Sequence, residues 1–156
     1  MDIENSVYGK KAMDLFYEGY NCSQSVFLAF ADKYDMDRET AAKVSSSFGG
    51  GMGRLREVCG TVSGMFMVLG MLYGYDKPGD YEGKAKLYER IQELAHRFEE
   101  ANGSIICREL LGLSTKREEP VPEKRTPEYY KKRPCPQLAG MAAAILEEYL
   151  KEQEEV

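Results

Sequence analysis

The sequence predicts an all-α fold, and three observations lead to this expectation. Apolar residues recur at helical spacing along most of the chain. Residues that commonly cap helices precede several of these stretches, and glycine or proline often follows them. Alternating polar and apolar runs joined by hairpin turns, the pattern of a strand series, are missing. We therefore expect residues 1–156 to form one domain, a bundle of about six to seven helices.

Local signals in the N-terminal half place four helices. The expected helices cover residues 8–16, 22–30, 38–44 and 57–72. Gly19 should stop the first, Asn21 should cap the second, and Asp37 should cap the third. A glycine cluster at residues 49–53 separates the third helix from the fourth. The fourth is apolar on all sides, which indicates a helix buried inside the bundle.

Three further helices are expected in the C-terminal half. They cover residues 81–102, residues 105–111 and the segment from 135 to 149. Asp80 should cap the first of them, and Ser104 should cap the short helix that closes at Gly112. Cys135 stands directly before Pro136, and proline favours the first position of a helix. Cys135 is therefore a candidate cap of the last helix.

The segment at residues 115–134 differs in composition from the rest of the chain. Five of the six prolines fall between Pro120 and Pro136, and seven lysines or arginines are mixed with four glutamates in the segment. Such a composition is typical of a long, irregular and exposed connection. We expect this connection to lead into the last helix.

Charge and hydropathy exclude several classes of protein. The formal net charge is −5 and the isoelectric point is about 5.1, which argues against nucleic-acid binding. No secretory signal is visible at the start, so a cytoplasmic protein is expected. Residues 58–75 carry no charge, but glycines and hydroxyl groups dilute their hydrophobicity, and a buried helix explains them better than a membrane span.

Four cysteines are the main candidates for chemistry. They are Cys22, Cys59, Cys107 and Cys135, spaced by 37, 48 and 28 positions. All four fall at or near expected helix starts, where free N–H groups and the positive end of the helix dipole favour an anion. A thiolate is such an anion, so we expect lowered pKa values. Structural disulfides are rare in the cytoplasm, which leaves metal binding, redox chemistry or plain burial.

The glycines around Cys59 suggest that a group comes close to its sulfur. Gly60 and Gly64 are four residues apart and share one helix face, with Ser63 beside them. Without side chains there, a backbone or an inorganic group can approach, so these three residues are candidates for cofactor binding. The alternative is that small residues let two helices pack closely. Glycines in the preceding loop can turn tightly and offer N–H groups to an anion.

The remaining candidates have simpler explanations. Arg54 and Arg56 flank the glycine loop and could face an anion, but solvated side chains are expected there. His96, the only histidine, is expected on the surface. Tyr129 and Tyr130 are expected to cover the core beneath the connection.

These cysteine segments carry a resemblance to a known family. They are GYNCSQSV around Cys22, CGTVSG from Cys59 to Gly64, GSIICRELLG around Cys107 and RPCPQLAGMAAAILEE around Cys135. From Gly19 onward the chain resembles the redox-active family named for its cysteine pattern, C_GCAxxG_C_C. It departs from that pattern at Thr61, where the family usually has alanine. The resemblance implies a redox role and a distant likeness to the non-haem part of split-Soret cytochromes, where cysteines serve an iron centre.

Several functions remain open. In the first hypothesis the four cysteines converge and bind an iron–sulfur cluster for electron transfer, and zinc could take the same four ligands. In the second the cysteines act as catalytic thiols in metal-free thiol–disulfide chemistry. In the third the protein is a helical scaffold with inert buried cysteines.

Each redox reading requires a partner. That partner is a redox protein or a small-molecule electron donor or acceptor. The glycine face of the apolar helix would also allow a homodimer. Cys59 is the expected central residue of the site, because it joins the glycine loop to the buried helix.

Overall fold

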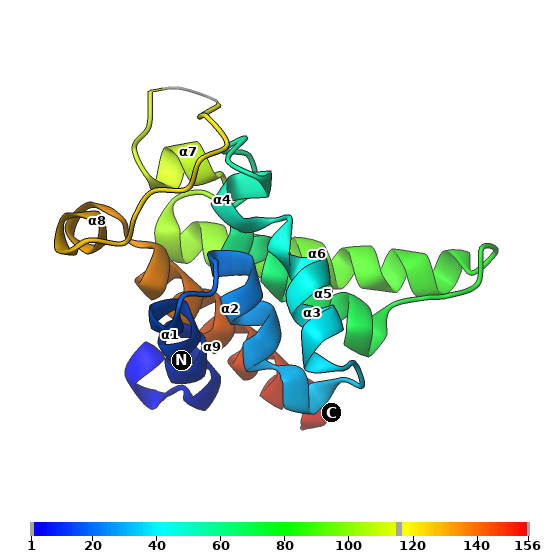
Figure 1. Ribbon diagram of the computed structural model, residues 1–156. Helices are drawn as coiled ribbons and strands as arrows, with labels where there is room; N and C mark the ends of the chain where they lie inside the picture. The colour runs from blue at the N-terminus through cyan, green and yellow to red at the C-terminus, as the bar shows by residue number, and fades with distance from the viewer. Residues whose placement is uncertain (1, 115–116, 156) are drawn as a thin grey trace.

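The computed structural model describes residues 2–114 and 117–155, and every regular element in them is a helix (Figure 1). The all-α prediction is confirmed. The helices are α1 (Val7–Glu18), α2 (Cys22–Ala29), α3 (Arg38–Ser46), α4 (Gly49–Met52), α5 (Gly60–Tyr73), α6 (Tyr81–Asn102), α7 (Cys107–Leu110), α8 (Pro127–Lys132) and α9 (Cys135–Glu154), with 3-10 turns at Ile3–Asn5 and Ala31–Lys33.

Helix α2 lies at the centre of the fold. It packs against α1, α3, α5 and α9, and nearly all of its side chains are buried. Phe16, Phe27, Phe30 and Phe98 are the largest fully buried side chains and come from α1, from α2 and its end, and from α6. The first half of α6 extends away from this core together with the loop before it (Figure 1). The bundle therefore buries the start of α2, where the first cysteine lies.

Local capping signals set several helix starts as predicted. The Asn21 side chain accepts a hydrogen bond from the Gln24 N–H at 2.9 Å, and the Gln24 side chain accepts one from the Asn21 N–H. The Asp37 and Asp80 side chains each accept one N–H hydrogen bond at the starts of α3 and α6, from Thr40 and Gly83. These caps satisfy N–H groups that a helix start leaves unpaired.

The predicted cap at Ser104 is wrong. Helix α7 begins only at Cys107, and its cap residue is Ile106. The reason is a backbone contact with the segment before α5, in which the Cys59 N–H donates to the Ile105 carbonyl at 2.8 Å. This pairing holds Ile106 extended, so the chain cannot turn into a helix earlier. The Ser104 hydroxyl instead accepts a hydrogen bond from the Ile106 N–H at 2.9 Å.

The connection before the last helix is more ordered than predicted. Thr115 and Lys116 lie outside the described residues. Pro127–Lys132 forms α8, which the Thr126 side chain caps and which has Pro127 at its first position. Helix α9 begins at Cys135 with Pro134 as its cap residue, so Cys135 is its first residue and not its cap.

Helix α5 lies inside the bundle, as its apolar sequence predicts. It packs against α2, α6 and α9, and the side chains of its first two turns are buried. Among the described residues, no helix combines the length and the hydropathy that crossing a membrane requires.

Candidate functional site: a buried four-cysteine cavity

The four cysteines line one small cavity at the meeting point of four helix starts. Cys22, Cys107 and Cys135 are the first residues of α2, α7 and α9, and Cys59 directly precedes α5. The expected position of the cysteines at helix starts is therefore confirmed. The remaining lining residues are Gly60, Thr61, Leu110, Leu111 and Leu138. All four cysteines are free thiols.

A backbone contact fixes the relative position of two of the cysteines. The Cys59 N–H donates to the Ile105 carbonyl at 2.8 Å, and the Cys107 N–H donates to the Glu57 carbonyl at 2.6 Å. Val58 lies between these two hydrogen bonds in an isolated antiparallel bridge. Cys59 and Cys107 are thus held by the main chain itself, although 48 positions separate them in the sequence.

Two glycines let the main chain press against the cysteine side chains. A Cβ atom at Gly60 would overlap the Cys22 sulfur and would lie 2.8 Å from the Phe48 carbonyl oxygen. A Cβ atom at Gly51 would lie 2.6 Å from the Cys107 Cβ. Both contacts are too close for any residue with a side chain. These two glycines thus make room for the side chains of Cys22 and Cys107. The sequence had suggested that the glycines clear space around the Cys59 sulfur.

Of the three residues expected to bind a cofactor beside Cys59, only Gly60 lines the cavity. A Cβ atom at Gly64 would lie 2.7 Å from the Ser23 carbonyl oxygen and 3.0 Å from the Val26 Cβ. Gly64 therefore allows α5 to pack closely on α2, as the packing alternative proposed. Ser63 is buried in the same helix, outside the cavity lining.

The first two cysteines each face hydrogen-bond donors. Backbone N–H groups of Gly50 and Ser23 point at the Cys22 sulfur. The Cys59 sulfur lies 3.1 Å from the Thr61 hydroxyl, and the Thr61 N–H also serves it. Thr61 is the position at which this chain departs from the C_GCAxxG_C_C pattern, and the departure supplies a hydroxyl to Cys59.

The other two sulfurs contact donor side chains. Arg56 Nη1 lies 3.5 Å from the Cys107 sulfur in the protein interior. The Tyr129 side chain interacts with the Cys135 sulfur and lowers the pKa of that thiol, opposing the effect of burial. Every cysteine of the cavity therefore has its own donor, and such donors stabilise negative charge on sulfur.

Burial dominates the acidity of three of these thiols. Removal from water raises the pKa of Cys22 and of Cys59, and it raises the pKa of Cys135 from 9.0 to about 12. Charge on neighbouring cysteines adds to the increase, and the hydrogen-bond donors oppose it without reversing it. The lowered pKa values expected from helix starts are wrong for these three residues, because the cost of burial exceeds the benefit of the helix dipole.

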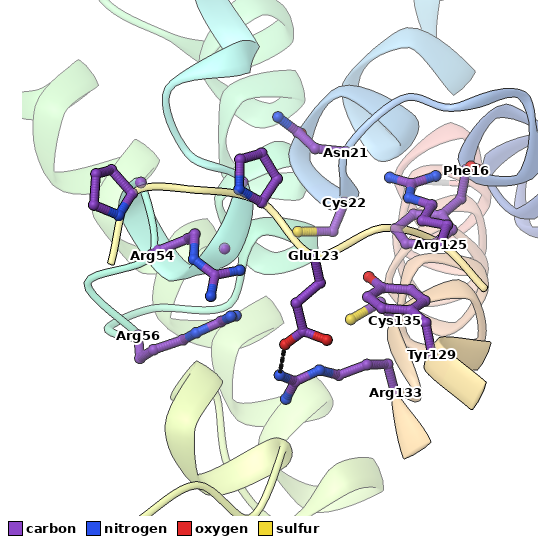
Figure 2. Close-up of a pocket in the computed structure, with 15 residues that line it drawn as sticks. Phe16, Asn21, Cys22, Arg54, Arg56, Glu123, Arg125, Tyr129, Arg133 and Cys135 are labelled. Carbon is purple, nitrogen blue, oxygen red and sulfur yellow. Dashed lines mark hydrogen bonds and ion pairs between the residues drawn. The ribbon is translucent and has the colours of Figure 1, made fainter. Parts of the chain in front are cut away.

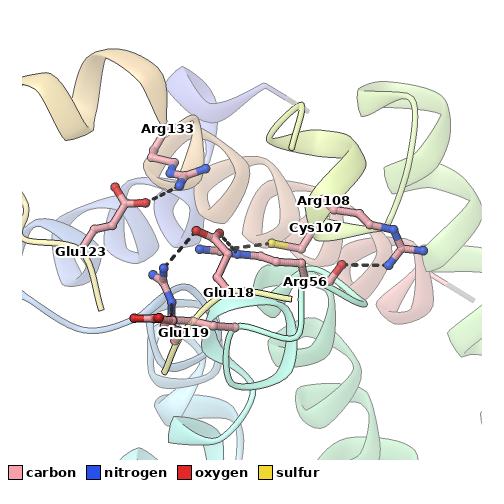
Figure 3. A network of polar contacts seen from close by, with 8 residues as sticks. Arg56, Cys107, Arg108, Glu118, Glu119, Glu123 and Arg133 are labelled. Atoms are coloured by element: carbon pink, nitrogen blue, oxygen red, sulfur yellow. Dashed lines mark hydrogen bonds and ion pairs between the residues drawn. The ribbon is translucent and has the colours of Figure 1, made fainter. Parts of the chain in front are cut away.

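Arg56 is buried, contrary to the expectation of a solvated side chain. It is 5% exposed, and its Nε donates to Glu118 at 2.6 Å (Figure 3). Arg54 Nη2 reaches the other oxygen of the same carboxylate at 3.1 Å. One glutamate from the connection therefore holds both arginines in place.

The glycine loop adopts a left-handed turn. Gly50, Gly51, Met52, Gly53 and Arg54 all have φ between 65° and 71°. Left-handed backbone is unfavourable for residues with a side chain, so Met52 and Arg54 are strained. Strained backbone persists only where the surroundings enforce it, and it tends to occur at functional sites. Here the turn aims the Gly50 N–H at the Cys22 sulfur.

Two other candidates lie away from the cavity. His96 is exposed on α6 and lies 3.1 Å from Glu100, one helical turn further on. Tyr130 packs edge-on against Tyr129 and is tilted against Tyr17, so it covers the outside of α1.

The chemistry of the residues around the cavity suits a metal centre, but the volume of the cavity does not. Four soft sulfur ligands, each with a hydrogen-bond donor, are suited to zinc or to an iron–sulfur cluster. The cavity, however, measures about 10 Å³, close to the room needed by one water molecule. Within residues 2–114 and 117–155, no group of three or more His, Cys, Asp or Glu side chains is spaced to hold a metal ion.

Fold and site together define an all-α protein with a buried four-cysteine centre. The family described as "Putative redox-active protein (C_GCAxxG_C_C)" matches residues 20–149, and the chain belongs to this family. No curated protein and no solved structure matches the chain.

Proposed function

We propose that this redox-active protein transfers electrons through an iron–sulfur cluster bound by its four cysteines. The observation that carries the proposal is the convergence of four cysteines, each with its own hydrogen-bond donor, on one buried cavity. Thiolates are the usual ligands of such clusters, and hydrogen bonds to the sulfurs set their reduction potential. Because the cavity measures about 10 Å³, it must widen when the cluster binds.

The chain itself would contribute three things. Leu110, Leu111 and Leu138 exclude water from the cavity, which strengthens the electrostatic interactions inside it. The donors to sulfur stabilise the thiolate form, and Arg56 adds a full positive charge beside Cys107. When bound, the cluster would supply a one-electron couple, and its iron would keep the ligating thiols deprotonated.

Metal-free thiol–disulfide chemistry is less well supported. The attacking species in such chemistry is the thiolate, and burial raises the pKa of Cys22, Cys59 and Cys135. These thiols therefore hold their protons at neutral pH. A scaffold with inert cysteines does not require a donor at each sulfur. A redox partner protein or a small electron donor or acceptor completes the proposed function.

The test is the cofactor content of protein purified without oxygen. Iron, zinc and acid-labile sulfide are measured per chain, together with the visible spectrum before and after dithionite. We expect iron and sulfide, with absorption that dithionite bleaches. Cys59→Ser should remove most of both while the far-ultraviolet circular dichroism stays helical. Ser45→Ala, a buried change on α3 outside the cavity, should leave both unchanged.

Other results would contradict the cluster. Zinc without colour would assign the four cysteines to a zinc site. Protein without metal, both as purified and after reconstitution with iron and sulfide, would end the metal hypothesis. Titration of free thiols before and after mild oxidation would then separate disulfide chemistry from inert cysteines.

A further inference from the structure

A second, larger pocket lies on the outer side of Cys22 and Cys135 (Figure 2). Its volume is about 430 Å³, which falls in the range of small-molecule sites. The glycine turn forms one wall, and the connection between residues 120 and 133 crosses the opening. Cys22 and Cys135 line both this pocket and the inner cavity, whereas Cys59 and Cys107 line only the inner one.

The pocket carries an excess of positive charge. Four arginines line it, and two carboxylates pair with them: Arg54, Arg56, Arg125 and Arg133, with Glu118 and Glu123. Two positive charges are therefore left over, in a chain whose formal net charge is −5. A local excess of this kind in an acidic protein needs a specific cause.

Arg125 contributes one of the uncompensated charges. Its guanidinium donates hydrogen bonds to the carbonyls of Phe16 and Tyr20 and lies 3.9 Å from the centre of the Phe16 ring. In the described part of the chain no carboxylate pairs with it. Two carbonyls and an aromatic ring thus hold a full positive charge in a fixed position at the pocket wall.

Arg133 is buried with most of its donors unused. It is 7% exposed, and within the described residues its guanidinium bonds only to Glu123. A guanidinium has five N–H donors, and the nitrogens of Arg133 are not among the buried side-chain atoms that lack a partner. Because Arg133 lines the pocket, its remaining donors are available to an acceptor that enters it.

We propose that this pocket binds a small organic anion with at least two negative charges on carboxylate or phosphate groups. The planar fork of arginine matches both groups, and several arginines around one pocket can bind two of them together. Tyr129 and Pro122 supply apolar surface for the carbon part of the molecule. The bound anion lies against Cys22 and Cys135. Its role as electron donor or acceptor rests on the proposed function, whereas its binding does not.

An alternative cause of the charge excess is the centre itself. Four thiolates around a metal would carry negative charge, and the arginines could serve only to neutralise it. Arg56 contacts a cysteine directly and fits this alternative. Arg125 differs from Arg56, because its guanidinium is bound to the carbonyls of Phe16 and Tyr20 rather than to a cysteine.

The test is calorimetric titration of the purified protein with defined anions. Pyrophosphate and succinate are the probes, with acetate as a monoanion and succinamide as a neutral analogue. We expect one site per chain for one or both dianionic probes, with affinity that falls as salt is added. Which probe binds more tightly distinguishes phosphate from carboxylate recognition.

Arginine variants show whether the probe occupies this pocket. Arg125→Gln should weaken binding by about tenfold or more, since a charged hydrogen bond is lost. Arg54→Gln is a second variant in the same pocket. Arg97→Gln, which removes an arginine that pairs with Glu93 and Glu152 on another face, should bind the probe as the wild type does. Circular dichroism checks that each variant is folded.

Alkylation gives an independent readout. Iodoacetamide is neutral, so in metal-free protein, whose thiols are not ligated, bound anion should slow its reaction at Cys22 and Cys135 more than at Cys59 and Cys107, as measured by mass spectrometry of the peptides. Absence of binding by both probes would overturn the proposal, as would equal losses in Arg125→Gln and Arg97→Gln. If anaerobically purified protein binds the anion but contains no iron, the pocket is supported and the cluster is contradicted. If it contains iron and sulfide but binds neither probe, the cluster is supported and the pocket is contradicted.

Discussion

Arg56 Nη1 lies 3.5 Å from the Cys107 sulfur, and the same guanidinium donates through Nε to Glu118 at 2.6 Å. A residue of the connection therefore fixes a positive charge beside Cys107, one of the four cysteines of the cavity. This relationship links the redox centre to the segment that covers the outer pocket.

Loss of this charge should change the redox potential. Reduction adds negative charge to the centre, and a nearby cation stabilises the reduced form. Arg56→Gln should therefore shift the midpoint potential to more negative values in a potentiometric titration. Arg54→Gln is the matched control, because Arg54 bonds to the same glutamate without contacting a cysteine. Equal shifts in both variants would contradict a direct effect of Arg56 on the centre.

The glycines of α5 offer a pair of opposite substitutions. Gly60→Ala should destabilise the protein by about 1–3 kcal/mol and reduce metal content, because its methyl group would overlap the Cys22 sulfur. Gly70→Ala lies in the same helix with nothing within 4 Å of the new methyl group, and it should stabilise by about 0.5–1 kcal/mol. Urea unfolding measures both changes. Unaltered stability and metal content in Gly60→Ala would show that the close approach is unimportant.

The metal-free, reduced protein should lose stability in alkali. The pKa of Cys135 is about 12 in the folded protein, against an ordinary value of 9.0. Above about pH 9 the unfolded chain releases a proton that the folded chain keeps, so the free energy of unfolding falls as pH rises toward 12. Urea unfolding between about pH 8 and about pH 10 should show this loss, and Cys135→Ser should show less of it. An equal slope in the variant would assign the loss to other groups.

The left-handed turn makes a further prediction at Met52. Its φ is 69°, a conformation that glycine adopts without strain. Met52→Gly should raise the free energy of unfolding by up to about 1 kcal/mol, since relief of strain exceeds the added flexibility of the unfolded chain. Leu55→Gly, at a neighbouring position with ordinary backbone, should lower it. A destabilised Met52→Gly would mean that the packing of the side chain outweighs its strain.

Local signals explain how much of the fold the sequence could predict. Asn21, Asp37 and Asp80 cap helices because a short polar side chain bonds to a backbone only three residues away. Helix α8 was also predictable, since Thr126 and Pro127 form a standard helix start. The density of prolines around it instead indicated an irregular segment. The prediction that Ser104 caps α7 was wrong because contact with a distant segment delays the start of this helix.

The parts of the site that depend on distant contacts could not be predicted. Arg56 is buried because Glu118, 62 positions later, folds back over it. The placement of the cysteines at helix starts was predictable from local sequence, but their acidity was not. The helix dipole acts within one turn, whereas burial depends on the whole bundle.

The backbone bridge between Val58 and Ile106 also constrains how the chain folds. It joins segments that lie on either side of α5 and α6, so the entropy of closing that loop opposes it, whereas a single helix forms from local contacts alone. We therefore expect the cysteines to remain open to alkylation after most helical signal has appeared in refolding. A cell would then have an interval in which the helices exist and the four sulfurs are still accessible for insertion of the proposed cluster.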